Sequence, residues 1–306
     1  MSEPLDLVII GAGVAGLSAA IQSARLGLNT MVVAEMGIGG QIMNAPHIDN
    51  YPGILESIGG YDLGPILHEQ AEAAGANFMF DRIEALEVAG DQFFVRGESE
   101  AIACKAVIIA AGSRPRMLGV PGEERLTGRG ISHCASCDGP LFRGKHVFVV
   151  GGGDAAFDEA LILSTYAHSV TILSRNDKPR AQKILRDRVE NTANIHLRCG
   201  VIVEQIIGED VVTGIAFRSS IAEPATIEPC DGVFVAIGSE ANTAWLQGLT
   251  KLTPDNKIIV DEMMRTSVPG VFAAGVIRAH SVGLLAAVAG DGATAAVAAH
   301  RHLARV

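Results

Sequence analysis

The sequence is poor in charged residues, and the positive ones are in the minority. Charged residues make up 19% of the 306 positions, with 24 Lys and Arg against 34 Asp and Glu, for a formal net charge of −10. This balance argues against nucleic acid or an anionic membrane surface as the main partner. With 48% apolar residues, the composition predicts a compact globular protein with little disorder. The length is sufficient for two domains.

The sequence also lacks a recognisable targeting or membrane-spanning segment. Its first residues, MSEPLDLVII, run almost directly into a strand pattern and carry no charged region or cleavage site of a signal peptide. The most apolar segment, 281–299, is interrupted by Asp291 and by glycines at 283, 290 and 292. These interruptions favour a helix buried against the core over a transmembrane segment. We therefore expect a cytoplasmic protein.

Cysteine is scarce, and only one pair has the spacing of a motif. Cys134 and Cys137 form a Cys-x-x-Cys pair, which can close and reopen as a two-electron couple. The odd total of 5 argues against a secreted disulfide framework. No second Cys-x-x-Cys or His pair stands at ligand spacing, so we predict no metal site. The remaining cysteines are expected to be ordinary buried or half-buried residues: Cys104, Cys199 and Cys230.

A glycine-rich fingerprint follows the first apolar run. Residues 5–10 (LDLVII) predict a buried parallel strand, GAGVAG follows at once, and the next residues have helical spacing. A second strand, TMVVAE, ends at Glu35. Gly11, Gly13 and Gly16 permit a tight turn and close backbone approach, while the helix N-terminus attracts pyrophosphate and the acid binds a ribose. The pattern predicts a dinucleotide site.

A second fingerprint repeats this pattern 140 residues further on. The strand pattern KHVFVV is followed by GGGDAA, which opens the helix FDEALILSTY, and VTILSR is the next strand. Gly151, Gly153, Asp154 and Ala155 occupy the loop and first turn of this second predicted nucleotide site. Ala156 replaces the sixth glycine and leaves slightly less room between helix and strand.

The remaining segments define the domain organisation. Residues 37–53 predict an irregular loop, either a plain surface loop or one that lines a cofactor with Gln41 and Asn50 as donors. Further predicted elements are an amphipathic helix over 61–74, a small antiparallel insert over 77–103 and a buried strand over 106–112. We predict an α/β protein with two Rossmann-like, three-layer dinucleotide-binding domains, the second inserted into the first. The first would comprise 1–116 and 243–306, and the second, with the redox pair, 117–242.

The motifs stand in the order found in low-molecular-weight thioredoxin reductases, and the resemblance covers nearly the whole chain. The stretches that carry it are GGQI…IDNYPG, CASCDG before GGGDAAFDEA, DGVFVAIG and TSVPGVFAAG. The resemblance implies a homodimeric enzyme in which an FAD domain is interrupted by a pyridine-nucleotide domain that carries the redox disulfide. It also implies a thioredoxin-like protein, or another thiol or disulfide, as substrate.

The resemblance assigns roles to individual residues. Cys137 would face the flavin, Cys134 would attack the partner's disulfide, and Asp138 would be the general acid and base. A thiolate is the reactive species, so the pair needs a proton donor and acceptor beside it; the alternative for Asp138 is a simple Asp-Gly turn residue. The residues implied to line the FAD are Gly11, Gly13, Gly16, Glu35, Gly40, Gln41, Asn50, Gly112 and Gly275.

The sequence departs from the family where the second nucleotide would bind. The family recognises the 2′-phosphate of NADPH with a His-Arg-Arg-x-x-x-Arg stretch, whereas Ser174, Arg175 and Asn176 align here, with Arg180 downstream. Removing a charge from a phosphate site weakens binding and relaxes discrimination. The occupant of this site, NADPH, NADH or a second FAD, therefore stays open.

Further departures concern the surroundings of the flavin. Val276 stands where the family has the aspartate that binds the ribityl chain, and a valine cannot accept that hydrogen bond. Gly283-Leu284-Leu285 replaces the family's Arg-Gln-Ala, and His133 stands where Tyr is usual. These changes resemble branches that do not use a pyridine nucleotide: ferredoxin-linked enzymes and diflavin-linked disulfide oxidoreductases.

We interpret the sequence as a flavin-linked thiol-disulfide oxidoreductase that exchanges electrons between FAD and the Cys134–Cys137 disulfide. Its second nucleotide site would hold a second FAD or another non-NADPH electron partner. The alternatives are a NAD(P)H-dependent thioredoxin reductase and a flavin redox sensor that does not turn over. The intact CASCD stretch argues against the sensor.

Overall fold

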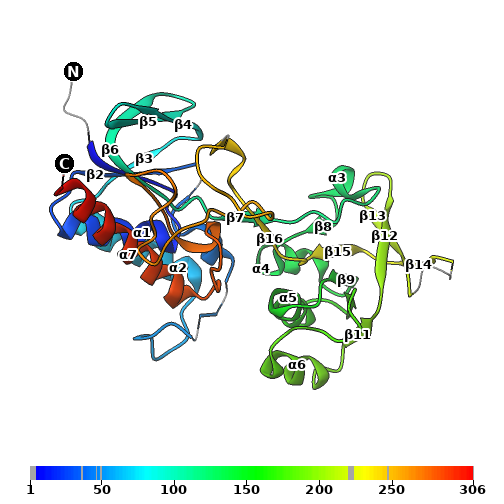
Figure 1. Cartoon of the computed structure of the whole chain (residues 1–306). Helices are drawn as coiled ribbons and strands as arrows, with labels where there is room; N and C mark the ends of the chain where they lie inside the picture. The colour runs from blue at the N-terminus through cyan, green and yellow to red at the C-terminus, as the bar shows by residue number, and fades with distance from the viewer. Residues whose placement is uncertain are drawn as a thin grey trace. The chain divides into compact units, whose positions relative to one another are not determined.

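The computed structural model describes residues 5–35, 37–45, 47–48, 50–219, 224–246 and 248–305. The chain divides into two compact units (Figure 1): unit 1 comprises Met1–Arg114 and Glu240–Val306, and unit 2 comprises Pro115–Ser239. The two connections between them are short strands that pair with each other, β7 (Ser113–Pro115) and β16 (Ser239–Ala241). Unit 2 is therefore an insertion in the sequence of unit 1.

Unit 1 is built on a seven-stranded sheet in the order β3-β2-β1-β6-β5-β4, with β17 also paired to β6. The pairs β3-β2, β2-β1, β1-β6 and β6-β17 are parallel, whereas the pairs β6-β5 and β5-β4 are antiparallel. The bounds are β1 Leu5–Ile10, β2 Thr30–Ala34, β3 Asn77–Phe80, β4 Ile83–Ala89, β5 Gln92–Gly97, β6 Ala101–Ile109 and β17 Val271–Ala273.

The sheet corrects one expectation about unit 1. β4, β5 and the first half of β6 form the expected antiparallel strands within this sheet, but β3 does not: it pairs in parallel with β2, where Met31 aligns with Asn77. β6 is one long strand whose first half pairs with β5 and whose second half pairs with β1. A four-residue run such as NFMF has the same pattern in a parallel edge strand as in a hairpin, so periodicity could not separate them.

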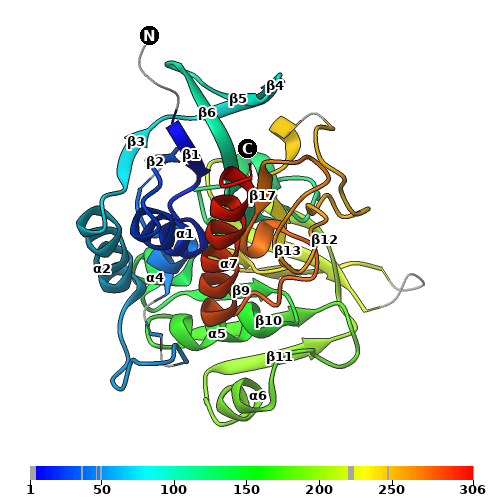
Figure 2. The ribbon, with the colours of Figure 1, turned by 60° about the vertical axis from the view of Figure 1, so that its left-hand side comes forward.

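Helices α1 (Val14–Arg25) and α7 (Leu285–Leu303) of unit 1 lie side by side (Figure 2). Their contact is close, because a Cβ on Gly292 would lie 2.1 Å from the Ala15 carbonyl oxygen. α7 contains most of the apolar segment that was expected to form a buried helix. Across the described ranges, no helix is both long enough and apolar enough to cross a membrane.

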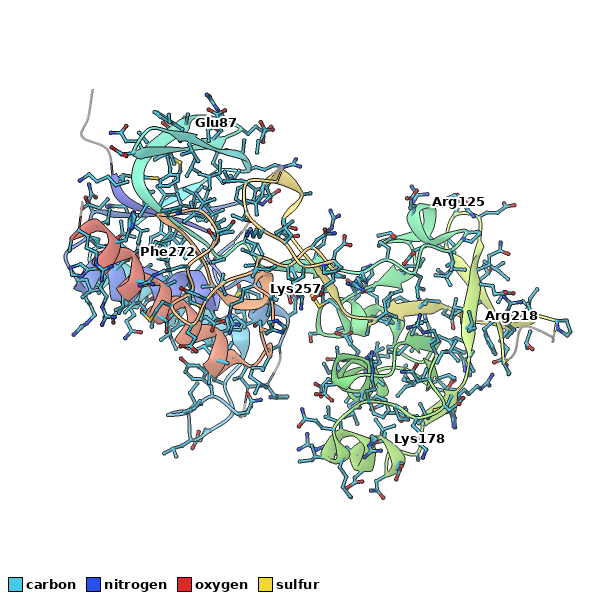
Figure 3. All side chains as sticks on the ribbon, in the orientation of Figure 1. Glu87, Arg125, Lys178, Arg218, Lys257 and Phe272 are labelled. Carbon is cyan, nitrogen blue, oxygen red and sulfur yellow. A yellow bond between two sulfur atoms is a disulfide. The ribbon has the colours of Figure 1, made fainter. Side chains whose placement is uncertain are left out.

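The other helices of unit 1 are short or lie at its surface. α2 (Gly60–Ala73) forms where an amphipathic helix was predicted. The segment predicted to be irregular contains one 3₁₀ turn, η1 (Gly40–Asn44). Two more such turns are η3 (Ala244–Leu246) and η4 (Gly275–Ile277). Phe272 of β17, labelled in Figure 3, is among the largest fully buried side chains of the core.

Unit 2 contains a five-stranded parallel sheet in the order β11-β10-β9-β15-β8 and a three-stranded antiparallel sheet, β12-β13-β14. The strands are β8 Ile131–Ser132, β9 His146–Val150, β10 Ser169–Ser174, β11 Ile195–Cys199, β12 Ile202–Gly208, β13 Val212–Arg218, β14 Thr226–Pro229 and β15 Gly232–Val235. The helices are α3 Glu123–Leu126, α4 Ala135–Asp138, α5 Asp154–Ser164, α6 Lys183–Glu190 and the 3₁₀ turn η2 Gly139–Phe142. The predicted α/β class with Rossmann-like sheets is confirmed: the five-stranded sheet of unit 2 is parallel, and the sheet of unit 1 has a parallel part with antiparallel β4 and β5 at one edge.

Candidate redox and nucleotide sites

The first glycine loop forms a tight turn between β1 and α1. Gly11 has a φ of 107°, and a Cβ there would lie 2.4 Å from the Ala110 carbonyl oxygen. A Cβ on Gly16 would lie 1.8 Å from the Gly11 carbonyl oxygen, so glycine is required where the helix passes the loop. Gly13 is the N-cap of α1, and no side chain caps the helix there. The loop therefore presents an uncapped helix N-terminus, which suits a pyrophosphate group.

The η1 segment folds over this loop. The Gly39 N–H donates to the Ala12 carbonyl oxygen over 2.9 Å, and a Cβ on Gly40 would lie 3.0 Å from the Gly13 Cα. The Gln41 side-chain amide donates to the Ser113 carbonyl oxygen and, over 3.0 Å, to its hydroxyl. Gly40 thus borders the loop, and Gln41 joins η1 to the strand that follows Gly112.

Three other residues implied to line the FAD lie in different surroundings. Gly275 has a φ of 85°, and its Cβ would meet that of Ala15 at 2.9 Å, which places it at the first turn of α1. Glu35 is exposed directly after β2, with its Oε1 3.6 Å from the Arg82 Nε. Asn50 is exposed between η1 and α2. The structure therefore brings Gly275 to the loop, while the role of Asn50 still depends on the resemblance.

Asp291 is a buried residue whose importance the sequence analysis missed. Its side chain is 8% exposed and forms an ion pair with Arg278, with 2.7 Å from the guanidinium Nε to Oδ2 and 2.7 Å from Nη2 to Oδ1. Oδ2 also accepts the Gly275 N–H at 3.2 Å. The pair thus holds the turn in which Val276 replaces the family's aspartate. An acidic residue inside an otherwise apolar helix was the available signal.

The second glycine loop, between β9 and α5, has the same backbone arrangement as the first. A Cβ on Gly151 would lie 2.2 Å from the Ala236 carbonyl oxygen, and Gly153 is an N-cap without a capping side chain. The Asp154 carboxylate accepts hydrogen bonds from the Gln182 backbone N–H (2.7 Å) and side-chain amide (2.6 Å). Asp154 therefore ties the start of α5 to the segment after β10, and Ala155 is exposed in the first turn.

Ser174, the last residue of β10, is packed inside unit 2. Ser174 is 1% exposed, its hydroxyl donates to the Asn176 carbonyl oxygen at 3.1 Å, and a Cβ on Gly152 would lie 2.5 Å from its Oγ. Arg175, Asn176 and Arg180 are exposed, as is their neighbour Lys178, labelled in Figure 3. The segment thus offers two arginines to a phosphate, whereas the side chain at 174 is packed inside.

Cys134 and Cys137 form a disulfide with a Cα–Cα distance of 5.4 Å. Cys134 is the N-cap of α4, and the Cys137 N–H donates to its Sγ at 3.1 Å. The Ser132 hydroxyl accepts the Cys134 N–H at 3.0 Å. Asp138 ends α4 directly after Cys137, which is exposed, whereas Cys134 is half-buried. The predicted redox pair is therefore formed, with hydrogen bonds from the backbone N–H groups of both cysteines.

Two further side chains contact this motif. One nitrogen of His133, Nδ1, lies 3.0 Å from the Val235 carbonyl oxygen, which orients the ring along β15. Glu159 on α5 accepts the Ala135 N–H through its Oε2. Burial raises the pKa of Glu159 to about 7; the hydrogen bond from Ala135 lowers it, and the charges of Asp158 and Asp138 raise it. No sequence motif indicates a role for Glu159.

The remaining cysteines lie elsewhere. Burial raises the pKa of the thiols of Cys104 and Cys230 to about 12, so both stay protonated at neutral pH. Burial, and the charge of Asp177, also raise the pKa of Cys199. Within the described part of the chain, no cluster of three or more His, Cys, Asp or Glu could hold a metal ion.

Two dinucleotide loops and a Cys-x-x-Cys disulfide on the inserted unit define the class of flavin-linked disulfide oxidoreductases. The chain belongs to the pyridine nucleotide-disulphide oxidoreductase family, whose model matches residues 5–300. It is 39% identical over 300 residues to the thioredoxin reductase of Listeria monocytogenes, covering 97% of this chain and 93% of that protein. It is 37% identical over 303 residues to that of Treponema pallidum, covering 99% and 98%.

A solved structure also shows similarity to thioredoxin reductases. The crystal structure of Lactococcus lactis thioredoxin reductase in its FR conformation aligns with a TM-score of 0.96 at 34% identity, covering 99% of this chain and 100% of that one. The protein is therefore an FAD-dependent disulfide oxidoreductase similar to thioredoxin reductases. These relatives lend no support to the diflavin-linked branch suggested by the sequence.

Proposed function

We propose that the protein exchanges two electrons between FAD in unit 1 and the Cys134–Cys137 disulfide in unit 2, and from there with a thioredoxin-like protein. The observation that carries this proposal is the disulfide itself, closed within a motif followed directly by Asp138. FAD, when bound, supplies a two-electron carrier that matches a disulfide couple. The uncapped N-terminus of α1 and the glycine cradle fit its pyrophosphate.

The residues of unit 2 would act in sequence. Two electrons and two protons convert the Cys134–Cys137 disulfide to two thiols, with Asp138 delivering and removing protons. The Cys134 thiolate then attacks the partner's disulfide and forms a mixed disulfide. Cys137 attacks Cys134 in turn, which restores the internal disulfide and releases the partner as a dithiol. A homodimer in the cytoplasm is part of this proposal, as for the family that the sequence resembles.

Single cysteine variants test these roles. Cys137→Ser leaves Cys134 without its resolving thiol, so it should form a stable adduct with a thioredoxin activated as its mixed disulfide with thionitrobenzoate. Cys134→Ser should form little adduct. Non-reducing electrophoresis measures both. An adduct with Cys134→Ser alone would reverse the two roles, and no adduct with either would argue for a sensor that does not turn over.

The second nucleotide site is proposed to accept a partner other than NADPH: NADH, a second FAD or another electron donor. Support comes from Ser174, which is packed against Gly152, and from Asn176, which replaces an arginine. The competing function is an NADPH-dependent thioredoxin reductase, favoured by the relatives and by the exposed Arg175 and Arg180.

Flavin stoichiometry and donor preference separate these possibilities. The first measurement is the number of flavins that denatured protein releases per chain. A value close to two supports a second FAD in unit 2, whereas a value close to one means that only unit 1 holds FAD. With one flavin, anaerobic bleaching by NADH at least as efficient as that by NADPH supports the proposal. One flavin together with a strong preference for NADPH would establish the competing function.

A further inference from the structure

Glu159 has no part in the electron exchange proposed above, yet it contacts the backbone of the redox motif. Its Oε2 accepts the N–H of Ala135, the residue that follows Cys134 and begins α4. Helix α5, which carries Glu159, packs against α4 and η2. The contact lies wholly within unit 2. A carboxyl group is therefore fixed one peptide bond away from the redox pair.

The surroundings of this carboxyl are acidic. The charged groups that act on it are Asp158, its neighbour on α5, and Asp138 on α4, and both favour its neutral form. Its bond to the Ala135 N–H acts in the opposite direction, because a carboxylate accepts a stronger hydrogen bond than a neutral acid. Around neutral pH, a substantial part of the population therefore carries a negative charge next to Cys134.

We propose that Glu159 is a positioning residue for the redox pair. It holds the Ala135 amide and so fixes the start of α4, and its negative charge disfavours a thiolate at Cys134. A nearby like charge raises a thiol pKa, and a dithiol whose thiolate is destabilised is a better reductant. Glu159 would thus keep the pair strongly reducing. This inference rests on the proposed electron exchange at Cys134–Cys137.

The test measures the equilibrium of the disulfide with a small dithiol. FAD-loaded enzyme is equilibrated with mixtures of reduced and oxidised dithiothreitol at fixed pH, thiols are trapped with a maleimide, and the peptide with both cysteines is quantified by mass spectrometry. Glu159→Gln keeps the shape and an acceptor for the Ala135 N–H but removes the charge. We expect a shift of about fivefold to tenfold toward the dithiol, up to about 30 mV, and faster alkylation of Cys134.

Two matched variants separate the effect of the Glu159 charge from the effect of a change in local structure. Asp158→Asn removes a charge from the neighbouring, exposed position, and we expect a shift of less than about twofold because water screens that charge. Glu159→Asp keeps the charge on a shorter side chain, so its equilibrium should stay within about twofold of the wild type. It also tests the inference if Glu159→Gln fails to fold.

Several results would overturn the inference. These are an unchanged equilibrium and alkylation rate in Glu159→Gln, an equal shift in Asp158→Asn, or a shift toward the dithiol in Glu159→Asp as large as that expected for Gln. None of these measurements needs a protein partner or electrons from FAD. If reduced flavin failed to reduce the wild-type disulfide, the proposed function would fail, but the dithiothreitol equilibrium would still be measurable.

Discussion

The two nucleotide loops of this protein share one backbone plan. In unit 1 the segment after β2 crosses the loop, and the Gly39 N–H donates to the Ala12 carbonyl oxygen over 2.9 Å. In unit 2 the segment after β10 crosses the corresponding loop, and the Arg180 N–H donates to the Gly152 carbonyl oxygen over 2.6 Å. Ala12 and Gly152 are the middle residues of the two turns. What each loop binds must therefore depend on the few side chains that differ.

Two differences stand out between the loops. Unit 1 has Gly16 where unit 2 has Ala156, so unit 2 accommodates a methyl group at the helix–strand contact. Directly after the second strand, unit 1 exposes Glu35, whereas unit 2 exposes Arg175 at the corresponding position. An exposed acid suits the hydroxyls of a ribose, whereas exposed arginines without an acid suit a phosphate. The same backbone turn thus carries side chains that suit two different ligand chemistries.

The largest effect is expected from exchanging the residues at the helix–strand contact. Gly16→Ala would place a Cβ 1.8 Å from the Gly11 carbonyl oxygen, so the loop must open and lose its fit to the pyrophosphate. We expect the FAD content of the purified protein to fall by more than about tenfold. The absorbance ratio of flavin to protein measures this.

The reciprocal change, Ala156→Gly, is the matched control. It removes a buried methyl group from unit 2 and leaves the first loop intact, so the FAD content should stay at the wild-type level. Full FAD retention by Gly16→Ala would show that the first loop tolerates a methyl group as well as the second, so the two loops would not differ at this contact.

The two glycine loops and the redox pair could be predicted from the sequence. The order strand, glycine loop, helix, strand is encoded locally, because glycine positions and apolar runs depend on the backbone of a few adjacent residues. The redox pair could be identified from its spacing alone. The parallel pairing of β3 could not, because the choice of a neighbouring strand depends on contacts with Met31, far away in sequence.

The contacts of the buried acids Asp291 and Glu159 could not be predicted either, because their partners are also distant in sequence. Asp291 is stabilised by Arg278, thirteen residues earlier, and Glu159 by the N–H of Ala135, twenty-four residues earlier. Neither spacing is a helical or strand period, so no local pattern links the partners. The fold alone shows that one acid has a cationic partner and the other an amide.

The buried ion pair between Asp291 and Arg278 gives the second prediction. Arg278→Ala would leave the Asp291 carboxylate buried without its cation, and breaking such a pair costs about 3 kcal/mol or more. We expect a loss of that size in the free energy of unfolding of unit 1, measured by urea denaturation with flavin fluorescence as the probe. Arg265→Ala is the control, since it removes an exposed ion pair with Asp261 that should contribute less than about 1 kcal/mol.

A double variant sharpens this prediction. Arg278→Met combined with Asp291→Leu replaces both charges by apolar side chains and should recover a large part of the lost stability, because no charge remains buried alone. Equal instability of the single and double variants would mean that the Gly275 turn needs the Asp291 carboxylate itself. An unchanged Arg278→Ala protein would contradict the role of the pair in unit 1.

The smallest effect is expected from restoring charge in the second loop. Asn176→Arg returns one arginine to an exposed position beside Arg175, where a guanidinium could contact a 2′-phosphate. We expect about tenfold tighter binding of adenosine 2′,5′-bisphosphate and an unchanged affinity for AMP, since one charge-assisted hydrogen bond contributes about 1.5 kcal/mol. Calorimetry measures the affinities for both ligands without requiring turnover.

The control is Asn191→Arg, at an exposed position at the end of α6, which should leave both affinities unchanged. Equal gains for both ligands in Asn176→Arg would mean that the loop recognises only negative charge, and the contrast with the acid-bearing loop of unit 1 would then depend on Glu35 alone.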